Sequence, residues 1–94
     1  MSSENDEKAF QSLKNTIEQT LKFPCPYRFK LIFEANLNLG ETIEKWFDVK
    51  AKISYTASKT NKYTSMTIDA DMNNSDEIMR IYFKASKLEG VIIL

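Results

Sequence analysis

Two alternating stretches close together in the sequence constrain the fold most. Residues 49–58 place apolar side chains at odd positions between Lys, Ser and Thr, and residues 63–71 carry Met66, Ile68 and Ala70 on one parity. A period of two residues is typical of a β-strand that buries one face. The four residues that separate the stretches, 59–62, are polar. The sequence therefore predicts two antiparallel strands joined as a hairpin, with one face of the pair in the core.

Two further strands and an N-terminal helix are expected around this hairpin. Residues 27–35 alternate with their apolar side chains at odd positions, and residues 91–94 form a short apolar run at the end of the chain. Before the first strand, apolar residues recur at steps of three and four, which is the spacing of one helix face. These residues are Phe10, Leu13, Ile17 and Leu21.

Two shorter helical patterns lie between the strands. The first covers about residues 40–47, with Asn38 as its expected N-cap, and the second covers residues 75–88 after Asn74. Asn favours N-caps because its side-chain oxygen accepts a hydrogen bond from a free backbone N–H of the first turn. Gly90 follows the second pattern and is expected to end that helix as its C′ residue.

The order of these patterns defines a fold class. After the N-terminal helix, the patterns run strand, helix, strand, strand, helix and strand. The simplest closure is an α+β ferredoxin-like βαββαβ arrangement, a four-stranded antiparallel sheet with two helices on one face. A chain of 94 residues has room for one such domain. We expect a disordered tail over residues 1–5, a helical extension over 6–22 and the ferredoxin-like domain over 23–94.

The composition argues against several classes of function. Thirteen Lys and Arg residues balance thirteen Asp and Glu residues, so no global basic field attracts nucleic acid or an anionic membrane. The chain has no His, the commonest general base and metal ligand, and its two Gly form no phosphate-binding loop. We therefore expect no catalytic residue, no metal site and no cofactor. One cysteine, Cys25, and the lack of an apolar run of about 20 residues favour a cytoplasmic protein outside the membrane.

Short motifs in this chain resemble a known family. Residues 23–30, with Phe-Pro-Cys-Pro-Tyr followed by Arg-Phe-Lys, are similar to the FPxPFxYK motif of the YbeD-like family of small bacterial proteins of unknown function. Ser58-Lys59 with residues 63–68 resembles its SK…YxSVSI hairpin, and residues 88–94 resemble its closing strand. The resemblance covers about residues 21–94 and implies a fold similar to ACT domains, the βαββαβ modules that sense amino acids and regulate enzymes. The longer N-terminal helix departs from the family pattern.

The solvent-facing side of the predicted sheet is the candidate binding surface, because the helices are expected to cover only the other side. It carries five candidate site residues, namely Arg28, Lys30, Lys50, Lys52 and Tyr63. This surface has three interpretations: an ordinary solvated face, a surface that binds a protein or an anion, or an RNA-binding face. The RNA interpretation is weakened because Tyr63 is the one aromatic residue on a face where such domains stack bases.

The last strand is the candidate dimer edge. Val91, Ile92 and Ile93 are apolar and uncharged, and an outer strand keeps backbone N–H and C=O groups available for pairing. The sequence therefore predicts a non-catalytic regulatory or adaptor domain that binds a small metabolite or a partner protein, with a homodimer as one form. The alternative is a small RNA-associated domain that uses the basic sheet face.

Overall fold

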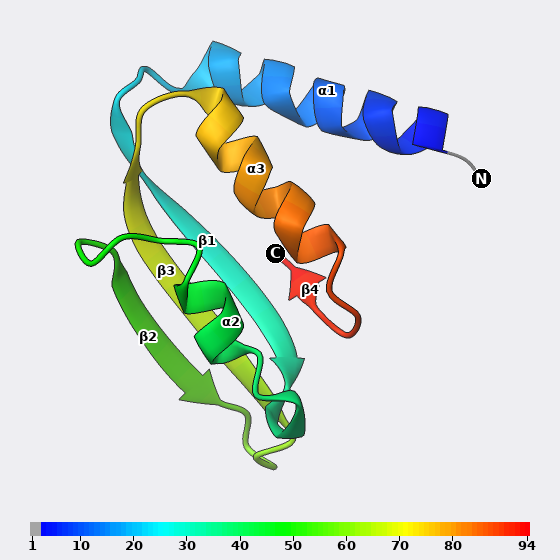
Figure 1. Cartoon of the computed structure of the whole chain (residues 1–94), viewed down its shortest axis with the longest axis vertical. Coiled ribbons are helices and arrows are strands. Elements are labelled where there is room, and N and C mark those ends of the chain that lie inside the picture. Colours follow the sequence, from blue (N-terminus) through cyan, green and yellow to red (C-terminus); the bar gives the residue numbers. More distant parts are fainter. Residues whose placement is uncertain (1–2) are drawn as a thin grey trace.

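The computed structural model describes residues 3–94, with side chains from Lys8 onward. Figure 1 shows how the helices and the sheet are arranged, and the chain passes through them in the order predicted from the sequence. The elements are α1 (Ser3–Thr20), β1 (Cys25–Glu34), the short 3-10 helix η1 (Ala35–Leu37), α2 (Gly40–Glu44), β2 (Lys52–Ala57), β3 (Tyr63–Met72), α3 (Ser75–Ser86) and β4 (Ile92–Ile93).

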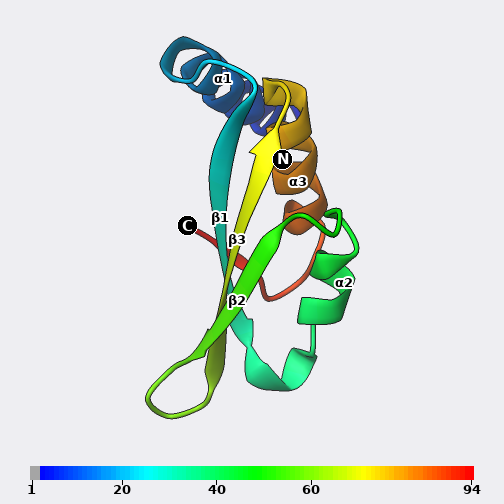
Figure 2. The ribbon, with the colours of Figure 1, turned by 90° about the vertical axis from the view of Figure 1, so that its left-hand side faces the viewer.

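The four strands form one antiparallel sheet in the order β2-β3-β1-β4. The central pair, β1 and β3, is in register along its whole length, from Cys25 opposite Met72 to Glu34 opposite Tyr63. Figure 2 views the sheet almost edge-on, with α2 and α3 on one side and the other side uncovered. The α+β ferredoxin-like fold is therefore confirmed, with α1 as an addition that crosses the end of the sheet near α3.

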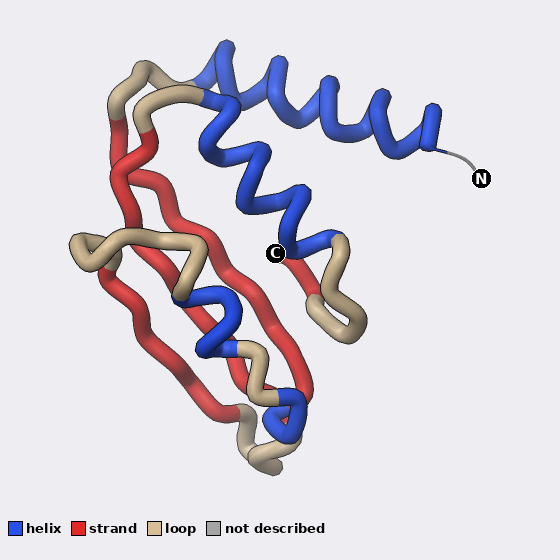
Figure 3. The backbone as a smooth tube through the Cα atoms, viewed as in Figure 1, coloured by secondary structure: helices blue, strands red, loops and turns tan. Residues whose placement is uncertain are grey.

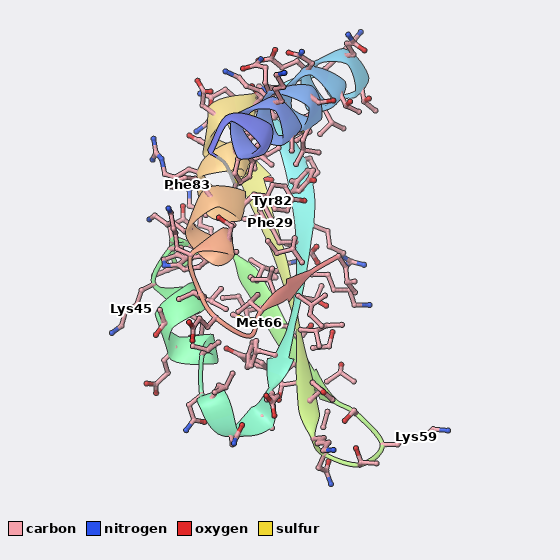
Figure 4. The ribbon with its side chains drawn as sticks, turned by 90° about the vertical axis from the view of Figure 1, so that its right-hand side faces the viewer. Phe29, Lys45, Lys59, Met66, Tyr82 and Phe83 are labelled. Carbon is pink, nitrogen blue, oxygen red and sulfur yellow. The ribbon has the colours of Figure 1, made fainter. Side chains whose placement is uncertain are left out.

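The core lies between the sheet and the two helices that cover it. Phe29 and Leu31 of β1 and Met66 and Ile68 of β3 are completely buried, which confirms the predicted parity of both strands. Figure 4 shows Phe29 and Met66 on the side of the sheet that faces the helices, with Tyr82 of α3 beside Phe29. The rings of Phe29 and Tyr82 pack edge to face, with their centroids 5.5 Å apart. These buried side chains fix which face of the sheet remains open to a partner.

The strand predicted over residues 49–58 is longer than the observed strand β2. β2 begins at Lys52, and Val49 is fully exposed in the turn before it. The Lys50 N–H donates a hydrogen bond to Asp48 Oδ1 at 2.9 Å, a local turn contact that competes with strand pairing. β2 is also an edge strand that pairs with one neighbour. The alternation of apolar and polar residues was therefore not enough to continue the strand over residues 49–51.

Several element boundaries also differ from the sequence-based prediction. The second helix ends at Glu44 rather than at residue 47, and Figure 3 shows it as a short helix between loops. Asn38 is not its N-cap, because Asn38 adopts the left-handed conformation that ends η1. Gly90 is not the C′ residue of α3, whose C-cap is Lys87; its φ of +82° serves the turn into β4.

The N-terminal helix begins earlier than the sequence indicated. α1 starts at Ser3, so residues 3–5 of the expected tail are helical, while residues 1 and 2 lie outside the described residues. Ile17 is buried against the domain and anchors the C-terminal half of α1. In residues 3–94, no helix is both long and apolar enough to cross a membrane.

Candidate functional site

The middle of the open sheet face carries an ion pair between neighbouring strands. The register places Lys52, Asp69 and Arg28 side by side across β2, β3 and β1. Arg28 Nε donates to Asp69 Oδ1 at 2.7 Å, and Arg28 Nη2 donates to Asp69 Oδ2 at 3.0 Å. The hydrogen bonds from Arg28 lower the pKa of Asp69, and those to Asp69 raise the pKa of Arg28. Arg28 is therefore engaged within the protein, and part of the predicted basic character of this face is neutralised.

An apolar patch lies beside this ion pair, at the β4 edge of the same face. Ile92 is opposite Ile32, and the Leu94 N–H donates to the Lys30 carbonyl at 3.0 Å. Residues opposite one another in antiparallel strands share a face, so Ile92 and Leu94 lie on the open side with Ile32 and Lys30. Ile92 and Leu94 are 54% and 63% exposed. We call Lys30, Ile32, Ile92 and Leu94 the edge patch.

The five residues expected to form the sheet-face site do not converge. Arg28, Lys30 and Lys52 share the middle of the face, whereas Lys50 lies in the turn before β2. Tyr63 pairs with Glu34 at the other end of β3. At about 3.3 Å per residue, the six residues from Tyr63 to Asp69 separate it from the ion pair by roughly 20 Å. Tyr63 and the basic residues therefore cannot contact one small ligand together.

A hollow of about 320 Å³ lies beside the start of β2 and contains Lys50 and Lys52. Asp48, Asp69 and Asp71 also line it. These carboxylates offset the two lysines, so the hollow has no surplus of positive charge for an anionic ligand.

The predicted dimer edge is an outer strand of the sheet. β4 follows β1 at the end of the strand order and pairs with Leu31 and Ile32. Val91 and Ile93 are half-buried, whereas Ile92 points to solvent. Ile92 is thus the residue of this edge that a second molecule can reach most directly.

A groove between α1 and α3 was not anticipated from the sequence. Its volume is about 700 Å³, and its lining residues are Lys8, Phe10, Gln11, Lys14, Met79, Arg80 and Phe83. Phe10 belonged to the predicted stripe of the N-terminal helix. Phe83 lies outside the apolar stripe of α3, which consists of Ile78, Ile81, Tyr82 and Ala85. An aromatic residue on the polar side of an amphipathic helix was the signal that sequence reasoning missed. We call this surface the helix groove.

Groups with catalytic or metal-binding chemistry are sparse. Cys25, the one cysteine of the chain, is half-buried at the start of β1, opposite Met72. Within residues 3–94, no three His, Cys, Asp or Glu side chains are grouped so that they could hold a metal ion. The features of the described surface that stand out are therefore its exposed apolar side chains and the cations beside them.

Comparison with known proteins matches most of the chain to proteins without an assigned role. Residues 18–94 match the family described as "Protein of unknown function (DUF493)". A "UPF0250 protein" of Shewanella amazonensis is 29% identical over 83 residues, which cover 84% of this chain and 94% of that protein. A "UPF0250 protein" of Buchnera aphidicola subsp. Baizongia pistaciae is 32% identical over 82 residues, covering 83% and 93%. The solution structure of protein HP0495 from H. pylori is similar with a TM-score of 0.62 and 25% identity, covering 80% of this chain and 86% of that one.

Proposed function

The chain belongs to the DUF493 family of proteins of unknown function, and we propose that it is a non-catalytic regulatory or adaptor module that binds a partner protein or a small metabolite. Membership of this family confirms the resemblance carried by the motifs at residues 23–30 and 58–68. Two arguments from the sequence support a module without catalysis: the absence of His and the absence of a cofactor-binding motif. The single cysteine fits a reducing compartment, and we place the protein in the cytoplasm.

The observation that carries this proposal is the edge patch on the uncovered sheet face. Ile92 and Leu94 are more than half exposed, and Ile32 and Lys30 lie beside them. Exposed apolar side chains that cluster next to polar ones are typical of interaction surfaces, whereas single exposed apolar residues need no explanation. The family resemblance implies a fold similar to that of ACT domains, which regulate enzymes, and this analogy supports a regulatory role without identifying a ligand.

A partner protein suits the edge patch better than a metabolite does. A small ligand is normally held in a concave site that buries most of its surface, whereas the edge patch lies on the face of an open sheet (Figure 2). RNA is less suited to this face, because Arg28 is paired with Asp69 and Tyr63 lies at the far end of β3. The outer edge of β4 also offers backbone groups to a second strand, which allows a second copy of the chain as the partner.

Two lysine substitutions on the same face test this proposal. Ile92→Lys places a charge in the edge patch, and Ser54→Lys places the same charge on the exposed face of β2. In sedimentation velocity, we expect the parent and Ser54→Lys to associate as concentration rises and Ile92→Lys to remain monomeric. In parallel capture from lysate, a specific partner is expected to bind the parent and Ser54→Lys but not Ile92→Lys.

Two results would contradict the proposal. Identical behaviour of all three proteins in both experiments would mean that the edge patch binds no protein. A thermal stabilisation of the parent by an amino acid or acidic metabolite, unaffected by Ile92→Lys, would transfer the binding function to another site.

A further inference from the structure

We propose that the helix groove is a docking site for an acidic amphipathic helix of a partner protein. It is a second binding surface, separate from the edge patch, and the inference does not depend on the proposed role of that patch. The argument rests on the shape of the groove, its apolar floor and the sign of its charge.

The groove is wedge-shaped because α1 and α3 are joined at one end. Ser75 Oγ donates to Glu18 Oε2 at 2.6 Å, and Lys14 Nζ lies 2.8 Å from Asp76 Oδ1. Figure 1 shows the two helices diverging from this end, with the N-terminal part of α1 extending away from α3. The rings of Phe10 and Phe83 pack against each other between the helices, with their centroids 6.1 Å apart. The result is a groove of about 700 Å³ between the two helices.

The floor of the groove is apolar, and its most exposed side chain, Phe83, lies outside the core. Phe83 is 51% exposed, whereas the neighbouring Tyr82 is buried against the sheet. Figure 4 shows these two side chains leaving α3 on different sides, with Phe83 on the outer side. Phe10 and Met79 lie beside Phe83 and are half-buried against the core, so Phe83 supplies most of the apolar surface that the groove exposes. A partner that removes such an apolar surface from water gains binding free energy from its burial.

Among the residues whose side chains the structure describes, the charged residues that line the groove are basic. They are Lys8 and Lys14 from α1 and Arg80 from α3. Asp76 offsets the charge of Lys14 through their ion pair, which leaves Lys8 and Arg80 to interact with a partner. A further cation, Lys87 Nζ, lies 4.8 Å from the centroid of the Phe83 ring. Because the whole chain has no net charge, this local excess of positive charge selects acidic partners specifically.

The occupant that fits an apolar trough with a basic rim is a helix with apolar residues on one face and acidic residues beside them. Helices bind grooves of this type through apolar anchors spaced three and four residues apart. A membrane surface is too flat to enter a wedge between two helices. Single-stranded nucleic acid would need a longer cationic track and several stacking platforms.

This docking site is a property of the present chain more than of its family. The family match begins at residue 18, so Lys8, Phe10 and Lys14 lie outside it. One wall of the groove is therefore contributed by residues that the family description does not include. We expect the partner to be specific to proteins that carry this N-terminal helix.

The test uses a synthetic peptide helix with leucines at helical spacing and glutamates on its flanks. Two control peptides keep its length: one replaces each glutamate with lysine, and one scrambles the order so that no apolar face forms. Binding to the full chain is measured by fluorescence anisotropy. The acidic helix is expected to bind, more weakly as salt rises, and both controls are expected to bind much less.

Variants of the protein locate the binding site. Phe83→Ser and Arg80→Glu are each expected to weaken binding by about ten-fold or more. Lys59→Glu makes the same charge change at the tip of the β2–β3 hairpin, far from α1 in Figure 4, and is expected to leave binding unchanged. Ile92→Lys is also expected to leave peptide binding unchanged, which separates this test from that of the edge patch. Because Phe83 and Arg80 are exposed, these variants are expected to melt near the parent temperature.

Several outcomes would overturn the proposal. They include no binding of the acidic helix at about 1 mM, equal binding of the lysine peptide, and full affinity in a folded Phe83→Ser variant. Binding of anionic vesicles or single-stranded RNA that Phe83→Ser abolishes, in place of peptide binding, would assign the groove to another class of partner. Self-association of the parent that Phe83→Ser removes would assign it to a second copy of this chain.

Discussion

A pair of tyrosine hydroxyls fixes α3 to the sheet, and its removal gives a quantitative test of the packing. Tyr27 of β1 and Tyr82 of α3 share a hydrogen bond of 2.7 Å, with their rings perpendicular. Tyr82 is 9% exposed, and Tyr27 is half-buried. Burial, together with the hydrogen bond to Tyr27, raises the pKa of Tyr82 above its usual value. The Tyr82 hydroxyl therefore depends on Tyr27 for a partner.

The two single substitutions are expected to differ from their combination. Tyr27→Phe leaves the buried Tyr82 hydroxyl without a partner, and the free energy of unfolding is expected to fall by about 1–3 kcal/mol. Tyr82→Phe leaves the Tyr27 hydroxyl, which is less buried, so the loss is expected to be about 1 kcal/mol. Replacing both tyrosines removes both hydroxyls and leaves the apolar rings in place. The double variant is therefore expected to be nearly as stable as the parent.

Urea denaturation followed by the fluorescence of Trp46, the one tryptophan, measures these differences. Tyr63→Phe is the control, because Tyr63 is an exposed tyrosine at the end of β3, and its free energy of unfolding is expected to stay within about 0.5 kcal/mol of the parent. If the losses of the two single variants add in the double variant, the hydroxyl pair is not a coupled contact. The attachment of α3 to β1 would then rest on ring packing alone.

Three further predictions follow from individual contacts. Ile68→Asp is expected to lower the free energy of unfolding by about 4 kcal/mol or more, since it buries an unpaired carboxylate. Thr67→Asp is expected to lower it much less, and equal melting temperatures of the two variants would refute the strand register. Asn74→Ala is expected to cost about 1 kcal/mol in urea denaturation, because the Asn74 side chain accepts the Glu77 N–H at 3.0 Å, and an unchanged midpoint would refute the cap. Burial and a hydrogen bond to Glu44 raise the pKa of Tyr55 from 10.0 to about 12. Its stabilising contribution is complete below pH 10 and is lost as pH rises toward 12, so parent melts are expected to fall more over this range than those of Tyr55→Phe.

The central part of the fold was readable from the sequence because burial there follows a simple period. β1 and β3 are the inner strands, and along each of them one parity is buried or half-buried, as with Phe29 and Ile68. The predicted strand at β2 was too long because local turn contacts help to determine where an edge strand begins. The hydrogen bond from the Lys50 N–H to Asp48 is such a contact. Periodicity carries no information about such competition.

The surfaces were harder to predict than the core. Arg28 was expected to be an available cation, but which acidic residue lies opposite it depends on the register of β1 with β3, and that register brings Asp69 within 2.7 Å. The helix groove depends on how α1 is placed against α3, which is a tertiary contact between residues far apart in sequence. Phe83 gave a local signal, because it lies off the apolar stripe, but no sequence pattern placed Phe10 beside it.

The arrangement of the two candidate surfaces favours an adaptor over a switch. The edge patch belongs to the part of the chain that the family match covers, whereas the helix groove needs residues before 18. α3 lies between the sheet and the helix groove, since Tyr82 packs on the sheet and Phe83 lines the groove. A signal between the surfaces would have to move α3, yet α3 is held by completely buried Ile78 and by the Tyr27–Tyr82 hydrogen bond. Closely packed interiors resist such displacement, so we expect the two surfaces to bind independently, with a groove ligand leaving the proposed self-association through the edge patch unchanged.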